Sequence, residues 1–345
     1  MTSKHFFKLS KLSPQEQTEA GKRTRASKQN FPILQGMSLY KLLLEPKGIR
    51  EPHWHANASE LGYCLKGTVL INMYHTDNMR SNFLVEEGDV FFIPSGALHH
   101  IENVGNSNAE LLLQFSHEEP EDFNLSSTLS VFSDAVLGNT WNVSKDIFHS
   151  LKRTSQSVFA TLRSDLALIP ENARYETPYR YSLKKSNPLL TNEGGSAYVA
   201  RQNIWPILKN QALYSLCLTN IGMREPHWHP ETAELGYVEK GRGRMSILSP
   251  SGEIDTYIME EGDIYFIPKA YPHHIENLQN EILHLLIFFD QAMPRDIGFT
   301  GSILSYSEEV LSSVTKMEKT DLKQLPKYYS DLFIVKNINQ QVFRK

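Results

Sequence analysis

The sequence predicts an all-β protein built from two tandem antiparallel jelly-roll barrels, with short helical segments after each barrel. Two observations predict this class. The chain repeats itself at a fixed offset, and each copy alternates short apolar runs with turn residues. The 345 residues suffice for two domains with proper cores, and a content of 40% hydrophobic and 21% charged residues is typical of globular proteins.

The internal repeat is the strongest of these observations. REPHWHANASELGY begins at residue 50 and REPHWHPETAELGY at residue 224, an offset of 174 residues. The same offset relates the two copies of EEGD, of FIP and of HHIEN. The repeat therefore spans at least residues 31–103 and 205–277, which indicates two copies of one domain.

A polar region of weak periodicity lies between the copies, at about residues 165–197. Prolines and the pair Gly194-Gly195 interrupt it, as is typical of linkers. We therefore expect an N-terminal domain over residues 1–170 and a C-terminal domain over residues 171–345.

Within each copy, the apolar runs have the pattern of strands. These runs are SLYKLLLEP, TVLINMYH and ELLLQFS in the first copy, and YSLCLTN, RMSILS and HLLIFF in the second. Gly, Asn and Pro separate them at intervals of about ten residues, which favours a sandwich or barrel. Residues 133–140 and 307–317, which follow the two copies, are predicted to form short helices, the second capped by Ser307.

Charge and hydropathy exclude several classes of partner. The net charge is −4 and no dense Lys/Arg stripe is present, so nucleic acid is not expected as a partner. No apolar run approaches the length of a membrane-spanning helix, and residues 1–25 lack the apolar stretch of a secretory signal. We expect a soluble, cytoplasmic protein without membrane contacts.

Three histidines and one glutamate of each copy are candidate metal ligands. His53 and His55 are two residues apart in an extended segment, so their side chains point to the same face. Glu60 follows at an odd spacing and needs a bend in the intervening residues to reach the same point. His99 arrives from a later strand. The equivalent set in the second copy is His227, His229, Glu234 and His273.

Three imidazoles and a carboxylate, without thiolates, are a ligand set that leaves about two positions open on a six-coordinate ion. Mn²⁺ or iron suits this set best, while nickel, copper and zinc also fit it. A substrate or dioxygen would bind at the open positions. A lone histidine is more often an ordinary core or surface residue, but eight ligand-type residues at matching spacings favour one metal ion in each copy, two per chain.

The spacing of these residues resembles the two motifs of the cupin superfamily, Gly–x5–His–x–His–x4–Glu–x6–Gly and Gly–x5–Pro–x–Gly–x2–His–x3–Asn. Lys47 stands where the first motif opens with glycine, and Ala270 replaces a glycine of the second motif in the second copy. The matching residues are His53, His55, Glu60, Gly67, Gly88, Pro94, Gly96, His99 and Asn103 in the first copy, and His227, His229, Glu234, Gly241, Gly262, Pro268, His273 and Asn277 in the second.

Within the superfamily, the strings REPHWH and MREPHWH resemble the arginine-x-x-HWH signature of the oxalate decarboxylase group of two-barrel cupins. That resemblance implies manganese in each barrel, Arg50 and Arg224 as catalytic residues that bind the substrate carboxylate, and dioxygen-dependent cleavage of oxalate to formate and carbon dioxide. A guanidinium three residues before the first histidine ligand also suits a small carboxylate on chemical grounds. The resemblance further implies a homo-oligomer, a trimer or hexamer, assembled through the helical segments.

One feature of that group is not reproduced. Its proton-delivering glutamate lies in a Ser-Glu-Asn-Ser-Thr lid after the first barrel, and Leu125 stands at the matching position here. Leucine cannot transfer a proton. The comparable segment of the second barrel, residues 296–302, has no clear acid at its tip either. The alternatives are therefore another cupin metalloenzyme, of the oxalate oxidase or iron dioxygenase type, and a non-catalytic cupin that binds a metal or ligand.

Overall fold

The computed structural model describes residues 3–339 and divides into two compact units. The N-terminal barrel is Leu12–Lys185, and the C-terminal barrel joins the segment up to Lys11 to the residues from Ser186 onward. Each consists of two antiparallel sheets, so the predicted all-β class is confirmed. The predicted boundary between residues 170 and 171 stays a prediction.

The N-terminal barrel consists of two sheets. The first has seven strands in the order β14-β9-β6-β11-β4-β3-β2. The second has six strands, five of them in the order β12-β5-β10-β7-β8, and its sixth strand, β13, also pairs with β5. The bounds of the first sheet are β2 (Glu16–Thr18), β3 (Gly21–Ala26), β4 (Ser38–Leu44), β6 (Glu60–Lys66), β9 (Asp89–Ile93), β11 (Ala109–Phe115) and β14 (Arg180–Ser182). Those of the second are β5 (Gly48–His55), β7 (Thr68–Tyr74), β8 (Arg80–Glu86), β10 (Leu98–Asn103), β12 (Asp122–Asn124) and β13 (Ala160–Leu162).

The C-terminal barrel repeats this arrangement, with the sheets β1-β22-β19-β24-β17-β16-β15 and β21-β20-β23-β18-β25, and β26 paired with β18. Its first sheet comprises β1 (Phe6–Phe7), β15 (Leu190–Asn192), β16 (Gly195–Ala200), β17 (Ala212–Leu218), β19 (Glu234–Lys240), β22 (Ile264–Ile267) and β24 (Leu283–Phe289). Its second sheet comprises β18 (Gly222–Trp228), β20 (Arg242–Leu248), β21 (Ile254–Glu260), β23 (His273–Asn277), β25 (Ile297–Gly298) and β26 (Ile334–Lys336).

The core of the C-terminal barrel follows the two-residue period of its strands. Alternate residues of β17, Tyr214, Leu216 and Leu218, are buried in one apolar cluster with Leu283 and Leu285 of β24. Side chains two apart share a face of a strand, so these positions fill the space between the sheets. The same space holds the histidines described below.

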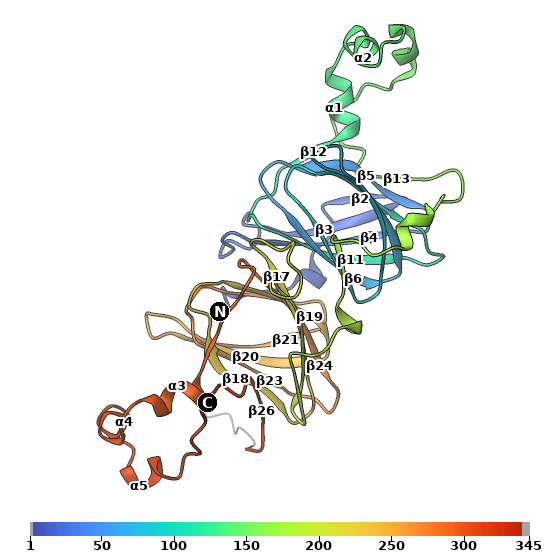
Figure 1. The fold of residues 1–345 in the computed structure, drawn as a ribbon. Coiled ribbons are helices and arrows are strands. Elements are labelled where there is room, and N and C mark those ends of the chain that lie inside the picture. Colours follow the sequence, from blue (N-terminus) through green and yellow to red (C-terminus); the bar gives the residue numbers. More distant parts are fainter. Residues whose placement is uncertain (1–2, 340–345) are drawn as a thin grey trace. The chain divides into compact units, whose positions relative to one another are not determined.

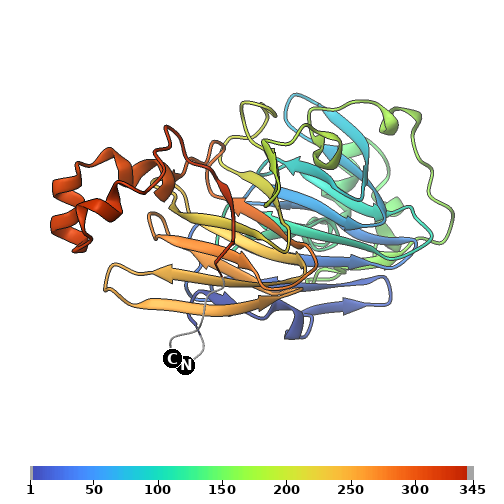
Figure 2. The ribbon, with the colours of Figure 1, turned by 90° about the horizontal axis from the view of Figure 1, so that it is seen from below.

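The helical segments lie after each barrel, as predicted. Ser133 and Ser307 cap α2 and α4 by accepting a hydrogen bond from the backbone N–H three residues on. Figure 1 shows α1 and α2 extending from the end of the N-terminal barrel, and Figure 2 shows the corresponding helices of the C-terminal barrel, in red, projecting past its strands. The bounds are α1 (Leu125–Val131), α2 (Asp134–Trp141), α3 (Phe299–Ser302), α4 (Glu308–Thr315) and α5 (Lys319–Leu322), with 3-10 turns at η1 (Leu9–Lys11), η2 (Lys145–Ser150), η3 (Glu171–Arg174), η4 (Leu183–Lys185) and η5 (Ile303–Ser305).

Two features differ from the sequence-based expectation. The region expected as a linker contains β14, β15 and the start of β16, because short edge strands beside Pro and Gly have the same local signature as loops. Lys47 and Ala270, at glycine positions of the motifs, adopt the left-handed backbone themselves, with φ of 66° and 63°.

Of the described helices, none has the length and apolarity needed to cross a membrane.

Candidate metal centres

The four predicted ligands of the N-terminal barrel converge on one point. β5 carries His53 and His55 at its end, β6 begins with Glu60, and β10 places His99 directly opposite His53. The chain bends between β5 and β6, which returns the carboxylate to the face of the imidazoles. One ligand atom of each residue lies within 4.8 Å of all the others, and all four side chains are buried.

The C-terminal barrel forms the same cluster. His227 lies on β18 opposite His273 of β23, and Glu234 opens β19. With His229 these residues again offer buried ligand atoms within 4.8 Å of one another. The structure therefore brings together both predicted sets of four.

Hydrogen bonds to the far side of each ring fix how the imidazoles face the centre. Every one of the six rings has its Nδ1 bonded to an oxygen, at 2.7–3.0 Å, which leaves Nε2 for the interior of the cluster. Ligating histidines typically hold their second nitrogen in this way, since it sets the tautomer and orientation. The accepting oxygens are Glu51 O, Asp122 Oδ1 and Ala97 O in the first cluster, and Glu225 O, Arg295 O and Tyr271 O in the second.

Unsatisfied buried atoms show that the clusters fit a metal ion. Among the described residues, His99 Nε2 in the first cluster and His273 Nε2 in the second are buried without a hydrogen-bond partner. Buried polar atoms are nearly always paired, so an unpaired ring nitrogen inside each cluster requires a ligand of its own. Neutral nitrogens and an anionic oxygen suit a divalent ion.

The pKa shifts of His53 and Glu60 also suit a cation. Burial, and then the charge of Arg50, hold the pKa of His53 well below its usual value, so this ring is neutral at neutral pH. Burial alone would raise the pKa of Glu60, but the hydrogen bond with His55 and the nearby His99 ring lower it to about 2, so the carboxylate is ionised. The pKa values of His227 and Glu234 are lowered as well.

Each cluster has a buried arginine beside it, and both arginines are already held by the protein. Arg50 donates from Nη1 to Asn124 Oδ1 and Phe159 O, both at 3.1 Å, and from Nη2 to Asp122 at 3.1 Å. Its partner in the repeat, Arg224, lies 3.7 Å from the centroid of the Phe333 ring. It donates to Phe333 O at 2.9 Å and pairs with Asp296.

A carboxylate links the arginine to the metal ligands only in the N-terminal barrel. Asp122 accepts from His55 Nδ1 at 2.8 Å, from Arg50, and from Arg23 at 2.9 Å. Burial alone would raise the pKa of Asp122, but His55 and Arg23 hold it far below its usual range. The equivalent Asp296 pairs with Arg224, while His229 donates to the Arg295 backbone instead.

Sequence reasoning missed the segments that cover the arginines. Phe159 and Phe333 precede β13 and β26, and both have left-handed backbones, with φ of 61° and 65°. Each donates its N–H to a buried glutamate next to the arginine in sequence, Glu51 or Glu225. These pairs obey the 174-residue offset, so the repeat could have been extended to find them.

An enclosed cavity lies at the C-terminal cluster, against Arg224, His227, His229 and Glu234. It leaves only about 10 Å³ for the centre of a water molecule, which is room for about one water. A larger ligand therefore needs the surrounding residues to move.

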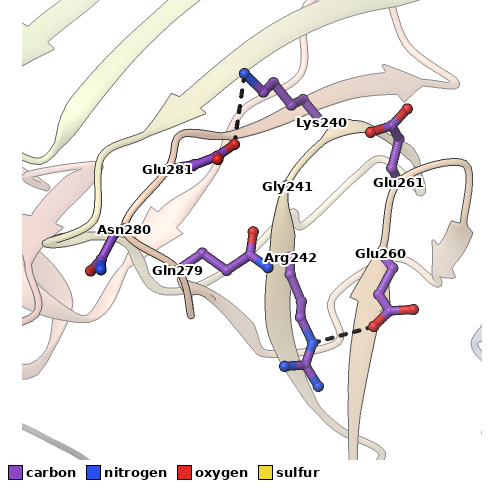
Figure 3. A pocket seen from close by; sticks show the side chains of 8 residues that line it. All are labelled: Lys240, Gly241, Arg242, Glu260, Glu261, Gln279, Asn280 and Glu281. Atoms are coloured by element: carbon purple, nitrogen blue, oxygen red, sulfur yellow. Dashed lines mark ion pairs between the residues drawn. The ribbon is translucent and has the colours of Figure 1, made fainter.

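The hollow in Figure 3 lies away from the metal ligands. It is open to solvent and contains ion pairs between Lys240 and Glu281 and between Arg242 and Glu260. Four of its five charged side chains form these pairs with each other.

Comparison with known proteins agrees with this geometry. The cupin family model matches residues 7–147 and 181–322. Oxalate decarboxylase OxdC of Bacillus subtilis (strain 168) is 30% identical over 278 residues, covering 78% of this chain and 71% of that protein. An oxalate decarboxylase of Arthroderma benhamiae is 23% identical over 263 residues, 68% of this chain and 61% of its own length. This chain therefore spans less than two thirds of that fungal relative.

Solved structures show the same fold. The structure of oxalate decarboxylase from Bacillus subtilis at pH 4.6 matches with a TM-score of 0.85 and 24% identity, over 97% of this chain and 88% of that one. A structure of that enzyme studied for its Mn(II) centres matches with a TM-score of 0.85 and 25% identity, over 97% and 89%. The repeat, the paired barrels and these matches establish that the chain belongs to the cupin family, as a two-barrel member of its oxalate decarboxylase-like branch.

Proposed function

We propose that the protein is a manganese enzyme with one ion in each barrel, acting on oxalate or a similar small carboxylic acid. The observation that carries the proposal is the convergence of three oriented imidazoles and one ionised carboxylate beside a buried arginine, twice in one chain. The relationship to oxalate decarboxylases, one of them studied for its Mn(II) centres, supports both the metal and the substrate class. Bound manganese would supply a Lewis acid and a one-electron redox partner.

Arg50 and Arg224 are proposed to bind the substrate carboxylate. Arg224 lines the cavity together with three metal ligands, so an anion at the metal would meet its guanidinium. A guanidinium can pair with a carboxylate through two parallel hydrogen bonds, whereas an ammonium acts as a point charge. Lysine keeps the positive charge but loses the second parallel hydrogen bond. Arg50→Lys and Arg224→Lys should therefore raise KM for the acid, although a substitution that keeps the charge would by charge alone leave it unchanged.

The residues at the position of the related group's lid, around Leu125, argue against efficient decarboxylation. Cleavage of the oxalate monoanion to formate and carbon dioxide requires a proton on the carbon of the new formate. Leu125, half-buried at the start of α1, has none to give. Asp122, the acid on the preceding strand, is held ionised by Arg23, Arg50 and His55, so it cannot serve as the donor near neutral pH.

Oxidation is therefore a specific second candidate. Oxalate, dioxygen and two protons give two molecules of carbon dioxide and one of hydrogen peroxide, and no carbon needs to be protonated in that reaction. Manganese-loaded protein should be incubated with oxalate under air at mildly acidic pH, and formate, carbon dioxide and peroxide measured against a metal-free control. Formate indicates decarboxylation and peroxide indicates oxidation. Absence of all three above the control removes oxalate as the substrate and favours a non-catalytic cupin.

Leu125→Glu tests the position of the lid. A carboxylic acid at the first residue of α1 should raise formate production by about 10²-fold or more, since positioned proton transfer contributes roughly 10²–10⁴. Leu125→Gln, which is similar in size but cannot deliver a proton, is the matched control. An unchanged formate rate in the glutamate variant would show that the lid donor belongs elsewhere.

The metal distinguishes the remaining enzyme class. Elemental analysis of protein purified without added metal should find manganese, and iron in its place would favour a dioxygenase. The same ligands accept several ions, so supply in the cell matters as well as the site.

A homo-oligomer is also proposed, a trimer or hexamer assembled through the helical segments. Val131 and Trp141 are 80% and 55% exposed in the segment after the first barrel, and Val314 is 76% exposed in the segment after the second. Each segment therefore offers exposed apolar side chains for contacts with another copy of the chain. Light scattering that finds a monomer would contradict this proposal. A cytoplasmic location stays a prediction, to be checked by cell fractionation.

A further inference from the structure

The two metal clusters differ in one buried hydroxyl. Phe91 of β9 and Tyr265 of β22 occupy equivalent positions, 174 residues apart. Each lies directly opposite a glycine of the neighbouring strand, Gly62 or Gly236. A Cβ on either glycine would lie 2.0 Å from the ring Cζ, so both rings lie flat across the glycine. The two aromatic side chains are thus placed alike, and only one of them carries an oxygen.

That oxygen reaches the carboxylate ligand of the C-terminal cluster. The Tyr265 hydroxyl donates to Glu234 Oε1 at 2.7 Å, and both residues are buried. The other oxygen, Oε2, lies 3.0 Å from His229 Nε2, on the side of the cluster. Glu60 also turns Oε2 to its cluster, 2.9 Å from His55 Nε2. Its Oε1, however, is buried and lacks any hydrogen-bond partner among the described residues.

We propose that Tyr265 is a positioning residue that holds Glu234 as a one-oxygen metal ligand, whereas Glu60 is free to bind through one oxygen or through both. The inference rests on the proposed function in one respect, that each cluster holds a metal ion. It gives the two centres different numbers of open positions, although their ligands have the same identity and spacing.

The chemistry follows from the two carboxylate oxygens. Carboxylates bind metal ions through one or two oxygens. In Glu234 the second oxygen already accepts a hydrogen bond from a hydroxyl, and turning it to the ion would leave the buried Tyr265 hydroxyl without that acceptor. In Glu60 no hydrogen bond within the described part of the chain holds the second oxygen, and the ion would satisfy it.

The expected coordination differs accordingly. On a six-coordinate ion, the C-terminal centre keeps about two positions for water or substrate, and the N-terminal centre has about one when Glu60 binds through both oxygens. An incoming carboxylate at the N-terminal centre could regain the second position by returning Glu60 to one-oxygen binding. The N-terminal centre therefore has an adjustable number of open positions, which the C-terminal centre lacks.

Exchanging the hydroxyl between the centres tests the inference. Each centre is studied alone in manganese-loaded full-length protein, with His229→Ala removing the C-terminal site and His55→Ala the N-terminal one. Phe91→Tyr and Tyr265→Phe are then added to the matching background. Bound waters are counted by electron–nuclear double resonance in ¹⁷O-labelled water, together with the Mn(II) electron paramagnetic resonance spectrum.

Phe91→Tyr should raise the water count of the N-terminal centre about two-fold, and Tyr265→Phe should lower that of the C-terminal centre about two-fold. Tyr237→Phe is the control, because it removes a buried hydroxyl from the same strand as Glu234, three residues away on the opposite face. It should leave the count and spectrum unchanged.

The outcomes separate the inference from the proposed function. If neither centre binds manganese, the proposed function fails. If both bind it and Tyr265→Phe leaves the water count and spectrum as they were, the inference is overturned. Tyr265→Phe removes one atom and adds none, so it decides the matter even where Phe91→Tyr does not fold.

Discussion

Asp122 offers the sharpest perturbation of the N-terminal centre, because one carboxylate meets three partners there. Its Oδ1 accepts from His55 at 2.8 Å, and its Oδ2 pairs with Arg23 at 2.9 Å and Arg50 at 3.1 Å. The Asp122 side chain is 14% exposed and those of the arginines 6% and 3%. Asp122→Asn keeps the shape but removes the anion from between two buried cations.

The expected magnitudes follow from these contacts. Breaking a buried ion pair costs about 3–5 kcal/mol. Arg23 keeps its pairing with Glu16 at 2.6 Å, so we expect a loss near the lower end, about 3 kcal/mol in the free energy of unfolding. His55 retains an amide oxygen as acceptor but loses the charge behind it, which should weaken metal affinity at this centre by about 10- to 100-fold.

Asp296→Asn is the matched control in the other barrel. Asp296 is 25% exposed and pairs with Arg224, and His229 donates to a backbone carbonyl instead. We expect a smaller loss of stability, about 1–2 kcal/mol, and little change in metal affinity. Urea unfolding of the metal-free proteins and chelator competition for Mn²⁺ measure the two quantities. Equal effects of the two substitutions on metal affinity would refute the role given to Asp122.

Three further predictions concern the C-terminal barrel. Ala270→Gly should stabilise the protein by about 0.5–1 kcal/mol in thermal or urea unfolding, because Ala270 has a φ of 63° that glycine adopts without strain. A loss of stability would mean that packing of the alanine methyl group outweighs the backbone strain. Gly236→Ala should displace the Tyr265 ring, because the new Cβ would lie 2.0 Å from the ring Cζ, and should destabilise the barrel by about 1–3 kcal/mol. Wild-type stability of this variant in thermal melts followed by circular dichroism would contradict the packing described. Burial alone would lower the pKa of His284, but contacts with Cys217 and Glu239 raise it to about 9. Because the folded pKa exceeds the unfolded value, the stabilisation by His284, at most about 3 kcal/mol, should be complete below about pH 6.5 and lost as pH rises through about 9; His284→Gln should remove this slope in urea unfolding measured across that range.

The metal ligands were predictable because their spacing has a geometric meaning. Two histidines two residues apart must share a face of a strand, and the repetition of His53, His55, Glu60 and His99 at one offset made coincidence implausible. The bend that returns Glu60 was required by that interpretation, and the structure contains it between β5 and β6. The helix beginning after Ser307 was predictable from capping chemistry.

The surroundings of the ligands were not predictable in the same way. Asp122 meets His55 from 67 residues away, and Phe159 meets Arg50 from 109 residues away, so no local pattern announces either contact. Phe91 and Tyr265 differ by a single atom in an otherwise matching repeat. The role of that atom became clear only from the structure, which places the ring across its glycine and the hydroxyl on Glu234. Short strands such as β14 pair at sheet edges, where pairing partners rather than sequence periodicity define them.

The metal content of each barrel tests the account most directly. Protein purified without added metal should contain about two manganese ions per chain by elemental analysis, and His55→Ala or His229→Ala should each reduce this to about one. A chain that holds no divalent metal, or one whose metal content is unaffected by both substitutions, would contradict the assignment of these clusters as metal centres.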